Sequence, residues 1–220
     1  MNQVNYQKEL EKILNTLQEK GEAASDYRPP HLFLHSCCAP CSSYCLEYLC
    51  RYFLITVFYY NPNISFSEEY RKRVAEQKRL IAAYNKEEKG WPIDIVEGDY
   101  EPERFYEMAK GYENCPEGGE RCFRCFDLRL RRTAELAAGG GYDYVATTLT
   151  ISPLKNAAKI NEIGQILSGE YGIPWLPSDF KKKNGYKRSI ELSAEYELYR
   201  QNYCGCAFSK AEREAQITNA

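Results

Sequence analysis

The stretch HLFLHSCCAPCSSYC (31–45) decides how the rest of this 220-residue chain is interpreted. The apolar residues before the cysteines suit a short buried strand, and the residues after them suit a helix with Pro40 in its first turn. Thiols at such a turn lie near the positive end of a helix, which favours the metal-binding thiolate. We therefore expect chemistry at Cys37, Cys38 and Cys41.

The whole chain holds ten cysteines and only two histidines. Its N-terminal residues are polar and resemble no signal peptide, and no apolar run approaches the roughly 20 residues that cross a membrane. We therefore expect a cytoplasmic protein without a membrane partner. In that reducing compartment so many thiols indicate metal binding or redox catalysis, and an all-thiolate site favours an iron–sulfur cluster or zinc.

Apolar runs alternate with amphipathic stretches along the chain, which predicts a single α/β domain: a mostly parallel sheet with helices on both faces. The expected strands are 31–36, 53–60, 92–98, 142–149 and 173–177. The expected helices are 3–20, 39–52, 66–88, 102–111, 121–138, one from the ISPLKN segment to about 171, and 188–201. We divide the chain into an N-terminal helix and loop (1–30), a catalytic domain (31–208) and a tail (209–220).

Polar residues follow several of the predicted strands. Because parallel sheets bind ligands beyond the carboxyl ends of their strands, these residues are predicted to open onto one active-site crevice. The residues expected to contact substrate are Asn61, Asn63, Arg129, Thr147 and Thr148. For the two asparagines, turn formation is an equally good explanation.

A second cysteine pair, Cys122-x-x-Cys125, has the i,i+3 spacing that lets both sulfurs face the same way on a helix. Together with Cys37 and Cys38 it supplies four thiolates, enough for a 4Fe–4S cluster or a Cys₄ zinc site. Adjacent cysteines are awkward in the usual zinc knuckles, which favours iron. Cys115 has no partner at metal spacing, and its role stays open.

The third pair is Cys204-Gly205-Cys206. Cysteines joined through one glycine can close only a small, strained disulfide, and strained disulfides are the redox-active ones. Two further metal ligands are the competing interpretation. Two basic clusters, Arg121–Arg132 and Lys181–Arg188, lie near the cysteines in sequence, and either track nucleic-acid phosphates or are solvated faces.

Five ordered segments together resemble the epoxyqueuosine reductases of the QueH family: CCAPC, CPEGGERCFRCFDLRL, ATTLTISPLKN, DFKKKNGY and YCGC. The resemblance runs from about 31 to 208. It implies an oxidoreductase of tRNA processing that reduces the epoxide of epoxyqueuosine at the tRNA wobble position to queuosine. This is the last step of queuosine biosynthesis and here needs no cobalamin. The implied partners are that tRNA and an unidentified electron donor.

The resemblance also implies site residues and a fold. A 4Fe–4S cluster is implied on Cys37, Cys38, Cys122 and Cys125, and a redox-active disulfide between Cys204 and Cys206. In the family an aspartate can stand where this chain has Cys41 and help hold an additional iron, so the presence of that iron stays open here. The implied fold is the nucleotide alpha-hydrolase-like relative of the Rossmann fold. Candidates to donate protons or bind substrate are Asp179, Lys181 and Tyr186, for which a plain surface position is as good an interpretation.

Two functions of other classes compete with this one. An ATP-dependent tRNA-thiolating enzyme with an iron–sulfur cluster needs a loop such as SGGxDS after its first strand, to hold pyrophosphate. This chain has SCCAPCSS (36–43) at that position, which argues against ATP. A zinc-binding, non-enzymatic module would leave the Cys204-Gly205-Cys206 pair unexplained.

Overall fold

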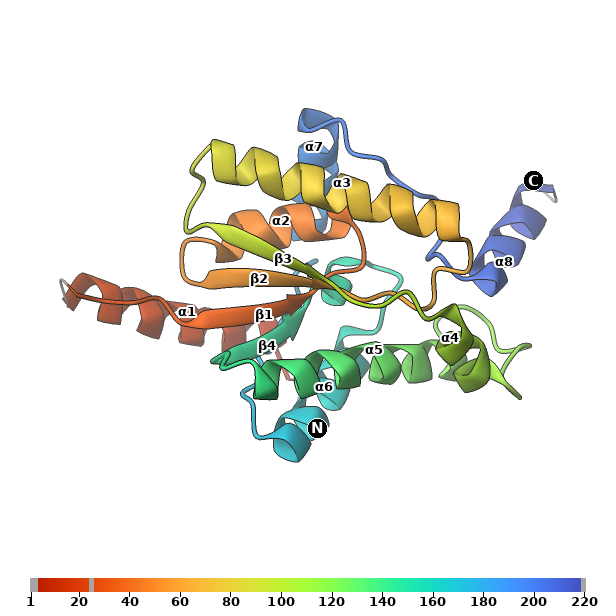
Figure 1. The fold of residues 1–220 in the computed structure, drawn as a ribbon, viewed down its shortest axis with the longest axis horizontal. Coiled ribbons are helices and arrows are strands. Elements are labelled where there is room, and N and C mark those ends of the chain that lie inside the picture. The colour runs from red at the N-terminus through yellow and green to blue at the C-terminus, as the bar shows by residue number, and fades with distance from the viewer. Residues whose placement is uncertain (1–3, 24–25, 219–220) are drawn as a thin grey trace.

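A four-stranded, all-parallel sheet lies at the centre of the computed structural model, which describes residues 4–23 and 26–218 (Figure 1). Its strands are β1 (His31–His35), β2 (Leu54–Tyr59), β3 (Ile93–Glu97) and β4 (Tyr144–Thr147), in the order β3-β2-β1-β4. Leu32 of β1 pairs with Ile55 on one side and with Tyr144 on the other. The predicted α/β class with a parallel sheet is confirmed.

Helices cover both faces of this sheet (Figure 1). One face carries α2 (Ala39–Leu49), α3 (Ser67–Lys86) and α7 (Gly185–Glu195), and the other carries α5 (Glu120–Gly139) and α6 (Ala157–Tyr171). Successive strand residues point to opposite faces, so Leu32 and Leu34 join the core under α2 and α3 while Phe33 joins the core under α5 and α6. A strand buried on both faces is apolar at most positions, as β1 and β2 are, and their polar residues His35 and Thr56 are hydrogen-bonded.

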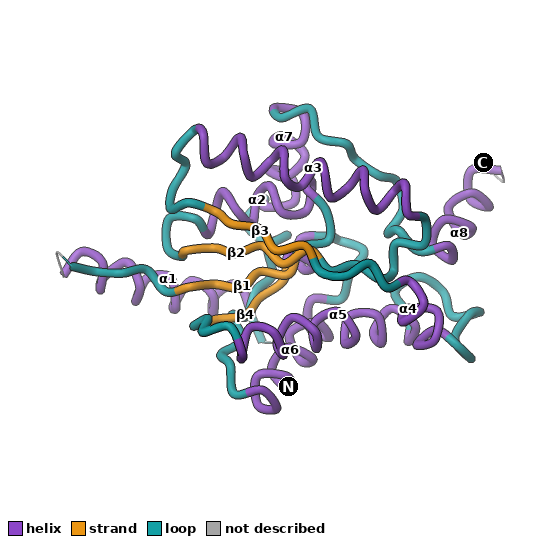
Figure 2. The backbone as a smooth tube through the Cα atoms, in the orientation of Figure 1, coloured by secondary structure: helices purple, strands orange, loops and turns teal. Residues whose placement is uncertain are grey.

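Three further helices complete the molecule. Helix α1 (Tyr6–Ala23) places Leu10 and Leu14 in the core of the α2 face. Helices α4 (Pro102–Ala109) and α8 (Ala207–Thr218) lie beyond the carboxyl edge of the sheet, where the long connecting loops also gather (Figure 2). None of the helices within the described residues combines the length and apolar character needed to cross a membrane.

Four elements differ from expectation. The strand expected at 173–177 makes only one bridge, between Val145 and Trp175, because Pro174 and Pro177 cannot donate to a ladder. The helix expected at 188–201 ends at Glu195, after which the chain turns at Tyr196 and Glu197 and continues without helix or strand to α8. The tail expected at 209–220 is largely the helix α8, with residues 219–220 outside the described part. The N-terminal helix, expected at 3–20, begins at Tyr6. Residue 3 lies outside the described residues.

Candidate functional site

The chain order of the sheet reverses between β1 and β4. The chain runs from β1 to β2 and β3 on one side and places β4 on the other side of β1. In open parallel sheets a crevice forms beyond the carboxyl ends of such neighbours. Cys37 follows β1 and Thr148 follows β4, and Cys37 Sγ lies 3.8 Å from Thr148 Oγ1. The fold thus places the first cysteine at the reversal point.

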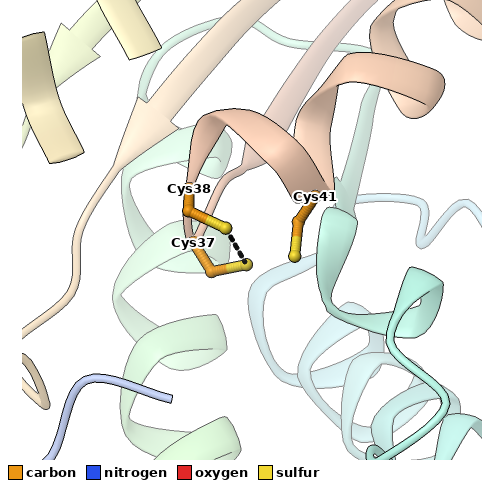
Figure 3. Close-up of side chains that lie close together, drawn as sticks. All are labelled: Cys37, Cys38 and Cys41. Carbon is orange, nitrogen blue, oxygen red and sulfur yellow. Dashed lines mark hydrogen bonds between the residues drawn. The ribbon is translucent and has the colours of Figure 1, made fainter. Parts of the chain in front are cut away.

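Cys37, Cys38 and Cys41 form a compact group at this point (Figure 3). Their sulfurs all lie within 4.8 Å of one another, and Cys37 Sγ and Cys38 Sγ are 3.8 Å apart. Tetrahedral zinc bonds of about 2.3 Å place two thiolates about 3.8 Å apart, so this spacing suits a single metal ion. Cys38 is extended, with φ −176°, and precedes the first turn of α2, which carries Cys41. Cys41, which the expected set of four thiolates does not include, therefore belongs to a group that can hold a metal ion.

The three thiols ionise unequally. The pKa of Cys37 lies well below its usual range, because the Cys38 and Cys41 thiols hydrogen-bond to its sulfur and Lys155 and Arg129 add positive charge. The same hydrogen bond raises the pKa of Cys38 to about 11. The pKa of Cys41 is also raised, through its contacts with Cys37 and Cys38. Cys37 is therefore the most readily ionised thiol of the three.

The second pair, Cys122 and Cys125, lies in the first turns of α5. Burial raises the pKa of Cys122 to about 11 and that of Cys125 to about 12. The backbone N–H of Gly118 donates to Cys122 Sγ over 3.2 Å. Both thiols line a small cavity whose wall also includes Cys204 and Cys206. The CxxC and CxC pairs, about 80 residues apart in sequence, therefore share one cavity.

A larger cavity of about 170 Å³ lies on the other side of Cys204. Its lining includes Cys37, Cys38, Cys41 and Cys204, so Cys204 borders both cavities. The structure thus brings the CC, CxxC and CxC motifs to two adjoining cavities, with Cys204 between them.

The loop that carries Cys204 is held by backbone contacts. Arg73 Nη1 donates to the Cys204 carbonyl over 3.0 Å, and the Ser65 N–H donates to the Gly205 carbonyl over 3.1 Å. Gly205 has φ +130°, and a Cβ there would lie 3.0 Å from Ile64. Only glycine adopts this conformation readily. Cys204 and Cys206 are both free thiols in this structure.

Helix α3 anchors the segment Tyr196–Cys204, which we call the strap. Glu76 accepts a hydrogen bond from the Tyr199 N–H over 2.7 Å, and Arg79 donates to the Tyr196 carbonyl over 2.7 Å. Arg73 holds the far end of the strap at Cys204. These contacts explain why α7 stops early and how the chain reaches the cysteine cavities.

Of the residues expected to contact substrate, Asn63 lines the smaller cavity, and most of the others already make hydrogen bonds within the described part of the chain. Asn61 is buried; its amide donates to the Ser36 carbonyl and its oxygen accepts from Arg129. Thr147 Oγ1 contacts His35 Nδ1 at 2.8 Å and accepts from the Leu149 N–H. Thr148 faces Cys37, as described above. Asn63 is buried beside the CxxC pair and its Oδ1 has no partner within the described part of the chain.

The three expected proton donors separate into two groups. Tyr186 lines the larger cysteine cavity. Asp179 and Lys181 are ion-paired with each other and line a neighbouring surface cavity. Lys155 lines both the larger cysteine cavity and the surface cavity that the ion pair lines.

Lys155 is a residue that the sequence did not single out. Burial acts to lower its pKa, but the thiolates of Cys204 and Cys37 act in the other direction and leave the pKa raised. It therefore stays cationic beside the cysteines. In sequence it is one lysine in the ISPLKN segment, with no charge cluster around it.

Arg73 was missed as well, although the sequence does contain a signal for it. Tyr70, Arg73, Val74 and Gln77 share the buried stripe of α3. A charged residue and an amide within an apolar helical stripe indicate buried polar contacts. Gln77 uses its oxygen to accept from Ser36 Oγ and Ser42 Oγ, each over 2.8 Å, and so braces the turn around the CC pair.

The remaining cysteines and the basic clusters are placed as follows. Cys45 and Cys50 are fully buried core residues. Cys115 lies at a separate surface cavity near α8. Much of the charge in the two basic clusters is paired with carboxylates: Arg121 with Glu212, Arg124 with Glu120, Arg131 with Asp127 and Glu170, Arg132 with Glu135, Lys183 with Glu11, and Arg188 with Glu47.

Comparison with known proteins agrees with this arrangement. The sequence profile of the family described as "Epoxyqueuosine reductase QueH" matches residues 32–212. This chain belongs to the QueH family. A protein named epoxyqueuosine reductase QueH from Staphylococcus epidermidis is 44% identical over 208 residues, which cover 94% of this chain and 84% of the relative. A protein of the same name from Streptococcus pyogenes is 40% identical, and the match covers 94% of this chain and 78% of the relative. Another, from Thermotoga maritima, is 36% identical, and the match covers 83% of this chain and 91% of the relative.

Membership of the QueH family decides between the interpretations that the sequence left open. It favours an oxidoreductase, and favours neither an ATP-using thiolating enzyme nor a zinc-binding module without activity. The cysteine group at the reversal point is a site that can hold a metal. The QueH match spans all three cysteine motifs and every residue that lines the two cavities.

Proposed function

We propose that this protein is an epoxyqueuosine reductase, which converts the epoxide of epoxyqueuosine in tRNA to the alkene of queuosine. The observation that carries the proposal is the convergence of the three cysteine motifs on two adjoining cavities in a member of the QueH family. The reaction takes up two electrons and two protons and releases the epoxide oxygen as water. A dithiol beside a thiolate-rich metal centre suits that requirement.

The proposed cofactor is a 4Fe–4S cluster on Cys37, Cys38, Cys122 and Cys125. Two observations support the fit. All four cysteines border the adjoining cavities. The buried Arg129 guanidinium has no partner for Nε and Nη1 in the described part of the chain, which indicates an anionic neighbour. Cys41 extends the donor set and is the residue we propose for an additional iron. When bound, such a centre supplies electrons singly and a Lewis-acidic iron.

The residues around the larger cavity have separate proposed tasks. Lys155 stays cationic and can bind the substrate oxygen that gains negative charge as the epoxide opens. Tyr186 shares this cavity and can donate a hydrogen bond or a proton to the same oxygen. The Asp179–Lys181 ion pair shares a neighbouring cavity with Lys155 and is kept as a candidate proton donor or substrate contact. Asn63, which lines the smaller cavity, and Thr148, beside Cys37, are the proposed substrate contacts.

Cys204 and Cys206 are the proposed electron relay. Their dithiol gives up two electrons and two protons as it closes to a disulfide, which matches what the epoxide takes up. A separate electron donor then returns the disulfide to the dithiol. Cys204 borders both cavities, so the relay adjoins the metal ligands and the space for substrate at once.

The test uses full-length protein purified without oxygen, with iron and sulfide analysis and an assay on tRNA that carries epoxyqueuosine, with dithionite as reductant. We expect about four iron and four sulfide per chain, with one further iron if Cys41 binds it, and formation of queuosine. A colourless protein that carries only zinc and is nevertheless fully active would overturn the cofactor assignment. An iron-loaded protein that leaves epoxyqueuosine unchanged would overturn the activity.

A further inference from the structure

Arg129 differs from the other fully buried arginines. Arg121 pairs with Glu212 and donates to two carbonyls, and Arg73 pairs with Glu69 and donates to the Cys204 carbonyl. Arg129 is only 1% exposed, yet no carboxylate of residues 4–23 or 26–218 lies within 4.0 Å of its nitrogens.

The hydrogen bonds of Arg129 are also incomplete. Nη2 donates to Asn61 Oδ1, whereas Nε and Nη1 are buried and have no partner among the residues described. A buried cation without a counter-charge is strongly unfavourable, and unpaired buried N–H groups add to the penalty. Such a residue indicates an anionic neighbour.

The groups around Arg129 are sulfurs. It lies one helical turn after Cys125 on α5, and although burial acts to lower its pKa, the nearby sulfurs of Cys125 and Cys37 keep that pKa raised. Cys125 belongs to the CxxC pair and Cys37 to the CC pair. Arg129 therefore stands between the two pairs of proposed metal ligands.

Asn61 fixes this position. Its Oδ1 accepts from Arg129, and its Nδ2 donates over 2.9 Å to the carbonyl of Ser36, the residue before Cys37. The Arg129 guanidinium is thus tied through one amide to the turn that carries the CC pair.

We propose that Arg129 is the internal counter-charge of the thiolate-bound metal centre: its guanidinium, clamped by Asn61, balances the negative charge of that centre and donates Nε–H and Nη1–H to it. The inference rests on the metal centre of the proposed function. It assigns Arg129 to positioning and charge balance instead of substrate contact. A positive charge at this place favours the more negative, reduced form of the centre and so raises its reduction potential.

The test compares Arg129→Met, which removes the charge at similar length, with Arg129→Lys, which keeps it. Arg132→Met is the matched control, because Arg132 lies one turn further along α5, is a third exposed and pairs with Glu135. For each full-length protein the melting temperature is measured with its metal centre and after chelation under reducing conditions, without oxygen. The rise in melting temperature that the metal centre causes is the first readout, and the midpoint potential followed by EPR is the second.

We expect the metal centre to raise the melting temperature of Arg129→Met less than that of wild type. The increase should be largely kept in Arg129→Lys and should equal that of wild type in Arg132→Met. The midpoint potential of Arg129→Met should be more negative than that of wild type. If Arg129 has only a packing role, both forms of Arg129→Met melt lower by the same amount, the rise is unchanged, and the proposal is wrong. If the increase in melting temperature is unchanged but tRNA binding is weaker, Arg129 contacts the substrate, as the sequence predicted, and the proposal is wrong.

These outcomes are distinct from a failure of the proposed function. A protein that binds metal but does not reduce epoxyqueuosine leaves the thermal comparison intact and refutes only the activity. A wild-type protein that acquires no metal in cells or on reconstitution with ferrous iron and sulfide would overturn the Arg129 assignment together with the cofactor.

Discussion

Cys37 Sγ and Thr148 Oγ1 lie 3.8 Å apart, although the two residues are separated by 111 positions in the chain. They meet because β1 and β4 are parallel neighbours and each residue follows the carboxyl end of its strand. The chain order of the sheet reverses at this pair of strands, so no further strand fills the space beyond them. The cysteine cavities open at that space.

The metal ligands are tested first. Cys37→Ser or Cys125→Ser should remove most of the iron and lower turnover by more than about 100-fold, since even the outer partners of metal ligands typically contribute 10–100-fold. Iron analysis and the tRNA assay check this. Cys50→Ala is the matched control: Cys50 is a fully buried core thiol away from the cavities, so its loss should cost about 1 kcal/mol of stability and leave iron content unchanged. Equal iron loss in the control would contradict the ligand assignment.

The relay prediction concerns Cys206→Ser. Iron content and the visible spectrum should stay near wild type while turnover collapses, because serine cannot close the disulfide with Cys204. Thiol counting should find two fewer titratable thiols in oxidised than in reduced wild type, and no such difference in the variant. Cys115→Ser, at a separate surface cavity, should behave as wild type in all three measurements. Iron loss in step with activity would make Cys206 a metal ligand instead.

The third prediction links the strap to pH. Glu76 has a pKa below its ordinary 4.5, because Arg79 hydrogen-bonds to it, with a further contribution from the Tyr199 N–H. Its folded-state pKa is depressed, so the stability it contributes is present above pH 4.5 and is lost as pH falls through the folded-state value. Glu76→Gln should therefore unfold about 1 kcal/mol more easily at pH 7 and approach wild type in acid.

Thermal unfolding across pH measures this difference. Exchange of the Tyr199 amide hydrogen, which Glu76 accepts, should also speed up in Glu76→Gln. Glu68→Gln, exposed on the same helix, should change neither quantity. A stability difference that stays constant from pH 7 into acid would show that the carboxylate charge contributes nothing.

The fourth prediction concerns tRNA phosphates. Lys182 and Lys187 are exposed, and within the described ranges no carboxylate pairs with them, in contrast to Lys183 and Arg188 in the same cluster. Changing both to Gln should weaken tRNA binding and reduce the slope of log affinity against log salt by about 2. Lys110→Gln, which removes an exposed lysine paired with Glu107, is the control and should leave the slope unchanged. An unchanged slope in the double variant would assign the cluster to solvated surface.

Local pattern was sufficient for the sheet and for the cysteine motifs. The mostly apolar runs 31–36 and 53–60 suit strands buried on both faces, and one helix separates them. Pattern failed at 173–177, where an apolar run suggested a strand but two prolines limit it to one bridge. It failed again after Glu195, where side chains of α3 hold the strap, which is not helical.

The sequence by itself determined the class of the domain, the three cysteine motifs and the family they belong to, because each of these depends on spacings within a few residues. Only the tertiary structure decided which charged groups meet those cysteines. Arg73 lies on α3, Arg129 on α5 and Lys155 in the loop before α6, far apart in the sequence. Their position beside the thiols follows from parallel strand pairing across more than a hundred residues, and no local pattern encodes that proximity.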